Sequence, residues 1–149
     1  MSSPTTRLPG EGEELRAGPT VSVVKVPGTA NDGQLGVVEM RLDAGWEGPP
    51  LHVHKHVHHI WYVLEGDVMF NVAGQSDRYP KGSCLYVPAA VPHGFSTRGG
   101  GSATVLQVDT PRSLDGYFRD LAQSFPPGQP VDPAAVAAVM RRHDTYPVK

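Results

Sequence analysis

The chain has 149 residues, of which 39% are hydrophobic and 19% are charged, and its formal net charge is −2. That balance is typical of one globular domain with its own core, and the lack of a basic stripe disfavours nucleic acid and anionic membranes as partners. The single cysteine, Cys84, excludes an internal disulfide, and no apolar segment has the length of a secretory signal or a membrane span, so we expect a cytoplasmic protein.

The predicted elements are short strands followed by helices. Residues 1–19 are polar and rich in Pro, Gly and Glu, and we expect a flexible N-terminal arm there. Strands are predicted over residues 21–26, 35–42, 51–56, 59–66, 67–74, 83–88, 93–97 and 103–109. The strands 59–66 and 67–74 are expected to pair as a hairpin about Gly66. Residues 20–112 therefore form an all-β domain.

From residue 113 the apolar positions follow the period of a helix. Ser113 is the expected N-cap of a first helix. Asp132 and Pro133 open a second helix, as N-cap and first helical residue. Residues 113–149 are thus predicted to be a C-terminal helical extension packed on the β domain.

Histidines are concentrated in one segment, because five of the seven lie between residues 52 and 59. His52 and His54 are two residues apart, so on a strand both point to the same face and can share one metal ion. Further ligands must come from other strands, and His59 and His93 are placed to supply them. Imidazole suits Zn, Cu, Fe and Ni, and is a poor match to Mg or Ca. The ordinary interpretation of His56, His58 and His143 is a solvated side chain.

Two segments resemble the paired motifs of the cupin superfamily. GWEGPPLHVHKHVHHIWYVLEG (45–66) resembles the first motif, and GSCLYVPAAVPHGF (82–95) resembles the second. The resemblance covers about residues 35–110 and implies a small β-barrel or jelly roll with one divalent metal ion inside, and a homodimer. By position it assigns metal ligands to His52, His54 and His93, and it places His59 where the family usually has a glutamate. His58 takes that place instead if the loop register differs by one.

A histidine in place of the glutamate changes the expected chemistry. Four neutral imidazoles leave the full +2 charge on the ion, which favours binding of an enolate or phenolate oxygen. The change also removes a possible general base and disfavours an oxidised metal. The sequence is most similar to zinc-type aromatic polyketide cyclases of actinomycetes among the cupins, and it is also similar to quercetinase-like cupins. Zinc is therefore the expected ion, with Ni, Fe, Co, Mn or Cu as alternatives.

We accordingly expect an enzyme that cyclises and dehydrates an aromatic or polyketide substrate. The alternatives are a quercetinase-like or diketone-cleaving dioxygenase and a non-catalytic, ligand-binding cupin. Strand alternation suggests an apolar pocket, although core packing is the alternative for each member: Met40, Trp61, Val63, Phe70, Phe95 and Gln107. Beyond the metal, Gln107 is a candidate donor to substrate or bound water, and His58 and Asp109 are candidate bases by residue type alone.

Overall fold

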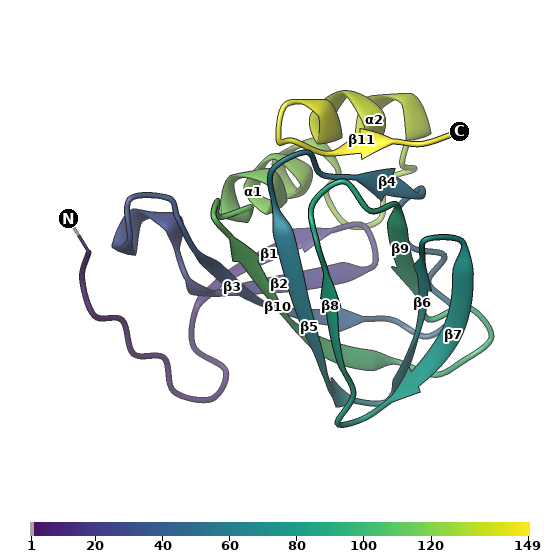
Figure 1. Ribbon diagram of the computed structural model, residues 1–149, viewed down its shortest axis with the longest axis horizontal. Helices are drawn as coiled ribbons and strands as arrows, with labels where there is room; N and C mark the ends of the chain where they lie inside the picture. Colours follow the sequence, from purple (N-terminus) through teal and green to yellow (C-terminus); the bar gives the residue numbers. More distant parts are fainter. Residues whose placement is uncertain (1) are drawn as a thin grey trace.

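The computed structural model describes residues 2–149 and is mostly β-structure, with two α-helices near the C-terminus (Figure 1). Met1, the first residue of the expected arm, lies outside the described residues. The elements are β1 (Glu13–Ala17), β2 (Thr20–Val26), the 3-10 helix η1 (Gly28–Ala30), β3 (Gly36–Leu42), β4 (His52–Val53), β5 (His58–Glu65), β6 (Asp67–Val72), β7 (Gln75–Pro80), β8 (Cys84–Val87), β9 (His93–Ser96), β10 (Ala103–Thr110), α1 (Asp115–Ser124), α2 (Pro133–Arg141) and β11 (Tyr146–Pro147).

The strands form two antiparallel sheets, in the orders β1-β2-β3-β10-β5-β8 and β11-β4-β9-β6-β7. Every second residue is buried along β3 and β10, and along β5 as far as Val63, as expected for strands with one face on a core. On β5 this alternation turns His59, Trp61 and Val63 inward and their neighbours outward. The predicted all-β jelly roll with C-terminal helices is therefore confirmed.

The predicted hairpin of residues 59–66 with 67–74 is wrong. β5 pairs with β10 and β8, whereas β6 pairs with β7 and β9 in the other sheet. Gly66 is the corner between the two sheets, with a φ of 72°. A Cβ there would lie 2.5 Å from the carbonyl oxygen of Ser102. The strand β7, which carries mostly exposed polar residues, was not predicted because it has no apolar alternation.

The expected N-terminal arm is also partly wrong, because residues 13–17 form β1 and pair with β2 along their whole length. β1 is an edge strand whose side chains are exposed or half-buried, so its sequence lacks the apolar pattern of a core strand. Residues 2–12 form no helix or strand.

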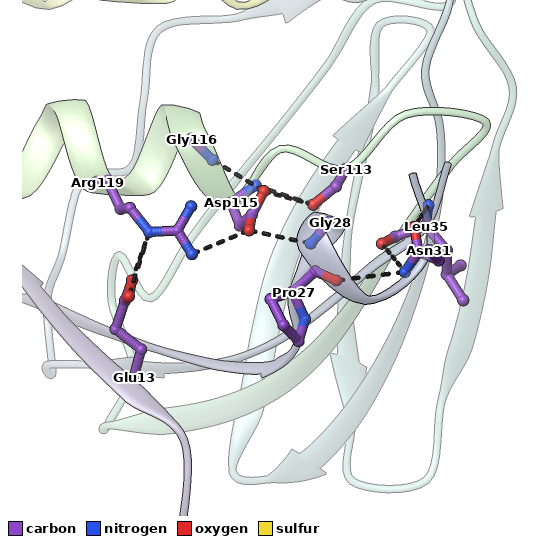
Figure 2. Close-up of polar contacts among 9 residues, drawn as sticks. All are labelled: Glu13, Pro27, Gly28, Asn31, Leu35, Ser113, Asp115, Gly116 and Arg119. Carbon is purple, nitrogen blue, oxygen red and sulfur yellow. Dashed lines mark hydrogen bonds and ion pairs between the residues drawn. The ribbon is translucent and has the colours of Figure 1, made fainter. Parts of the chain in front are cut away.

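Helix α1 is tied to the sheet by a network of polar side chains around Asp115 (Figure 2). The carboxylate of Asp115 accepts hydrogen bonds from the Ser113 hydroxyl (2.7 Å) and the Gly28 amide (3.1 Å). It also pairs with Arg119 (3.0 Å), whose Nε donates to Glu13 on β1 (2.6 Å). The network fixes the position of α1 against β1 and η1.

The two helices cover one end of the barrel, and β11 then adds to the edge of the smaller sheet beside β4 (Figure 1). Asp132 caps α2 as predicted, because its side chain accepts from the amide of Ala134, and Pro133 is the first helical residue. At α1, Leu114 rather than Ser113 holds the N-cap position. None of the helices formed by residues 2–149 is long and apolar enough to cross a membrane.

Candidate metal centre

Four buried histidines converge inside the barrel from three strands and one strand end. His52 lies on β4 directly opposite His93 on β9, His54 follows β4, and His59 lies on β5. One ring nitrogen from each of His52, His54 and His93 lies within 4.8 Å of the others. The ring of His59 lies beside this set, with its centroid 4.4 Å from that of His54. The structure thus brings together all four histidines predicted to bind the metal.

The outward-facing nitrogen of each ring already has a partner. The Nδ1 atoms of His52, His54 and His93 lie 2.8–2.9 Å from backbone carbonyl oxygens, those of Pro50, Asp144 and Val91 respectively. A carbonyl oxygen only accepts, so Nδ1 must carry the proton in each ring, and Nε2 keeps a free lone pair. This arrangement is typical of metal-binding histidines.

The Nε2 atoms of His54 and His93 are buried, and neither has a hydrogen-bond partner within residues 2–149. Buried polar atoms without partners are uncommon in folded proteins and call for an explanation. A transition metal ion supplies the missing partner for both lone pairs, and imidazole nitrogen is a suitable ligand for it. The residues present therefore fit a bound ion, and a buried three-histidine cluster is consistent with a metal site.

The electrostatics keep these rings neutral. Burial, with repulsion between neighbouring imidazoles, lowers the pKa of His54 and of His59 to about 3. Burial lowers the pKa of His93 to about 4 and holds that of His52 well below its usual value. At neutral pH no proton competes with a metal ion for these lone pairs.

His59 differs from the other three because its Nδ1 faces a carboxyl group. The distance from His59 Nδ1 to Oδ1 of Asp109 is 2.6 Å. The same oxygen accepts from the amide nitrogen of Gln107 (2.9 Å), whose amide oxygen accepts from Trp61 Nε1 (2.9 Å). Burial raises the pKa of Asp109 to about 8, although the bond from Gln107 opposes that rise. A divalent ion on His59 would favour the ionised carboxylate.

His58 and Gln107, two of the candidate catalytic residues, contact other protein groups and are not free to act on a substrate. His58 is on the outer face of β5, where its ring stacks on Tyr86 and its Nδ1 lies 3.1 Å from the Tyr86 hydroxyl. The register is therefore the one that turns His59 inward. Gln107 does line the cavity, but its side-chain amide is already engaged, since its oxygen accepts from Trp61 and its nitrogen donates to Asp109. Gln107 therefore orients Asp109, the carboxyl group that faces His59.

Three of the four histidines, His52, His54 and His59, line an apolar chamber of about 80 Å³. Of the expected pocket residues, Met40, Trp61, Phe95 and Gln107 line it. Val63 and Phe70 are packed in the hydrophobic core instead, which corrects that part of the prediction. The chamber adjoins an outer cleft of about 590 Å³, and the two share part of their walls: Ala17, Thr20, Trp46, Pro49, Tyr117 and Leu121.

Sequence reasoning missed the part of the wall that α1 supplies. Leu114, Tyr117, Phe118 and Leu121 have helical spacing, which predicts an apolar face without showing what it covers. The structure places this face over the metal end of the barrel. Asp109 was considered by type alone, and its alternation with Gln107 on one buried strand was the available signal that it faces inward.

Comparison with known proteins agrees with this architecture. The family model of the cupin domain matches residues 38–109, a segment that contains all four buried histidines. No curated protein matches the sequence.

Among solved structures, KdgF from Halomonas sp. is similar with a TM-score of 0.64 and 18% identity, over 74% of this chain and 96% of KdgF. An RmlC-like cupin from Shewanella frigidimarina has a TM-score of 0.61 and 23% identity, over 73% and 92%. The polyketide cyclase RemF from Streptomyces resistomycificus has a TM-score of 0.58 and 23% identity, over 74% and 80%. At these identities the likeness shows the fold alone.

Proposed function

We propose that this protein is a metal-dependent enzyme of the cupin superfamily that cyclises and dehydrates a poly-β-keto or phenolic substrate, with zinc as its ion. The observation that carries the proposal is a convergent site made of imidazoles alone, set against an apolar chamber. RemF supports the proposal as a cyclase on the same fold. The electrostatic reason is that neutral ligands leave an ion well suited to stabilise an oxyanion.

The chain's own residues have three tasks in this reaction. His52, His54 and His93, with His59 as a fourth ligand, would hold an ion that polarises a β-keto carbonyl and stabilises the resulting enolate. Met40, Trp61 and Phe95 line the chamber, exclude water and hold the carbon chain in a folded geometry. Asp109 fixes the orientation of the His59 ring through Nδ1.

The α1 helix adds one polar group to this wall. Three α1 residues line the chamber, and Tyr117 is the only one of them whose side chain can donate a hydrogen bond. Burial raises the pKa of Tyr117, so its phenol stays protonated at physiological pH. We assign it to binding a substrate oxygen in the neutral form.

The size of the two spaces indicates how a substrate would lie. A chamber of about 80 Å³ holds only the reacting end of an aromatic polyketide. The outer cleft, at about 590 Å³, is within the roughly 300–1,000 Å³ range of small-molecule sites. A substrate would therefore place its ketone groups at the histidines and the rest of its chain between α1 and the loop that contains Trp46.

The proposal is tested by turnover with and without oxygen. Zinc-loaded protein is incubated anaerobically with a synthetic linear poly-β-keto thioester, and the products are identified by mass spectrometry. We expect a cyclised product that has lost water, formed equally well with and without O₂. A product that needs O₂ and incorporates oxygen atoms would instead assign a dioxygenase. Unchanged substrate that nevertheless binds would assign a ligand-binding protein.

A further inference from the structure

We propose that residues 144–148, named here the tail clamp, form part of the metal centre by fixing His54 and the strand before it. The inference rests on the metal site but not on the cyclisation chemistry. Its starting point is that β4, which carries His52, has only two residues. Its contact with β9 is the single pair of His52 and His93.

The tail clamp supplies the second neighbour that so short a strand needs. β11 pairs with β4 in antiparallel register, with Tyr146 opposite Val53 and Pro147 opposite His52. The amide of Val148 donates to the carbonyl of Leu51 at 2.8 Å. β4 is thereby an inner strand of the sheet, with a neighbour on each side. The pairing stabilises β4 because unpaired backbone groups are costly when buried.

Asp144 holds the three residues that follow β4. Its carbonyl oxygen accepts from Nδ1 of His54 at 2.9 Å. Its carboxylate accepts from the amides of Lys55 (3.0 Å) and His56 (2.9 Å). The residue has a φ of 52°, in the left-handed region where Asp is tolerated better than most side chains. That conformation lets one residue present both its carbonyl and its carboxylate to the same segment.

Thr145 closes the arrangement from the other side. It is fully buried, and its hydroxyl donates to the carbonyl of His143 at 2.9 Å. The same oxygen lies 3.2 Å from Nδ1 of His54. The His54 ring therefore has two oxygens of the tail clamp at its outer nitrogen. These contacts select the tautomer that leaves Nε2 free for an ion.

The decisive variant is Asp144→Gly, because glycine adopts φ above zero without strain and lacks the carboxylate. We expect zinc affinity, measured by competition with a chromophoric chelator, to fall by roughly 10–100-fold. The visible spectrum of the cobalt-substituted protein should change, because the segment after His54 loses the carboxylate bonds at Lys55 and His56 that hold it in place. Asp144→Asn keeps an acceptor oxygen and should restore part of the affinity.

Asp132→Ala is the matched control, since it removes a carboxylate that caps α2 but is not bonded to the metal segment. Its zinc affinity should stay within about twofold of the unsubstituted protein. Equal zinc affinity and cobalt spectra in Asp144→Gly and the unsubstituted protein would overturn the proposal, as would an equal loss in Asp132→Ala. If Asp144→Gly does not fold, as judged by circular dichroism, the comparison is made with Asp144→Asn and Thr145→Val, and normal affinity in both would overturn it.

Discussion

His59 and its neighbour His58 show how much chemistry depends on the direction of one side chain. His59 is buried against Asp109, whereas His58 stacks on Tyr86 at the surface. The bond to Asp109 also changes the expectation that four neutral imidazoles leave the full +2 charge on the ion. A carboxylate hydrogen-bonded to a ligand imidazole makes that ligand more basic, so part of the missing negative charge is supplied from behind His59.

The adjacent pair provides a matched test of the fourth ligand. His59→Ala should weaken zinc binding by at least roughly tenfold, because it removes a ring beside the three-histidine cluster. It also leaves the buried Asp109 carboxyl without its imidazole partner. His58→Ala removes the same side chain from the outer face and should leave zinc affinity within about twofold. Titration with a competing chelator measures both. The opposite ranking would show that the ligand on β5 is misassigned.

At the residue scale the ligands could be predicted and their supports could not. The spacing of His52 and His54 follows from strand geometry alone, and the His93 position follows from the second motif. The carbonyls at Nδ1 of His52 and His93 lie only two residues earlier, but in irregular backbone whose conformation has no sequence signature. The partners of His54 and His59 lie 90 and 50 positions away, and no local pattern encodes contacts over such separations.

Among the elements, the corner at Gly66 decides which strands pair. A single residue separates β5 from β6, and the chain passes from one sheet to the other there. The sequence shows two adjacent strand-like segments with a turn residue between them, which is also how a hairpin looks. The structure differs because one residue is too few for a two-residue hairpin loop, and both strands instead pair with other strands, β5 with β10 and β6 with β9.

Gly66→Ala tests the tightness of this corner. A left-handed φ costs a non-glycine residue roughly 1–2 kcal/mol, and the new Cβ would also overlap the Ser102 carbonyl. Overpacking adds about 1–3 kcal/mol, so we expect a total loss of about 2–5 kcal/mol in urea unfolding. Gly74→Ala is the control, because its φ is 85° with no atom within 4 Å of the added Cβ. An equal loss in both variants would exclude crowding at Gly66.

Across the whole molecule, buried ionisable groups set the pH dependence of stability. The pKa values of about 3 for His54 and His59, and about 4 for His93, lie below the value near 6.5 expected in an unfolded chain. The unfolded state therefore binds more protons between these values, and stability falls as pH drops below about 6.5. Asp109, with its pKa raised to about 8, acts in the opposite direction, because the folded state keeps a proton that the unfolded state loses.

The metal-free protein is therefore expected to be most stable near pH 7, where proton uptake by four unfolded-state histidines balances that of the folded-state Asp109 carboxyl. Below that pH the four histidines outweigh the one carboxyl, and between about pH 7 and 8 Asp109 dominates. Urea unfolding in the presence of a chelator measures the profile. Asp109→Asn should remove the decline above pH 7 and make the rise on the acid side steeper, because Asp109 no longer opposes the histidines. A stability that rises steadily to pH 8 in the unsubstituted protein would contradict the assignment.

On this scale the sequence predicted the β domain and the helical extension, but not how the extension is joined to the barrel. The apolar stripe of α1 indicated a buried face. In the polar anchor, Asp115 accepts from Gly28, 87 positions away, and Arg119 donates to Glu13, 106 positions away (Figure 2). Such an anchor depends on the completed fold, and so does the strand that α2 leads into.

A short path joins α2 to the tail clamp. Val136 of α2 lines the outer cleft, and only Arg142 and His143 separate the helix from Asp144. A molecule that moved Asp144 by shifting α2 on entering the cleft would also alter the affinity for the ion. Reciprocity requires the ion to alter the affinity for that molecule by the same factor. Occupancy of the metal site would thus help to determine which molecules the entrance retains.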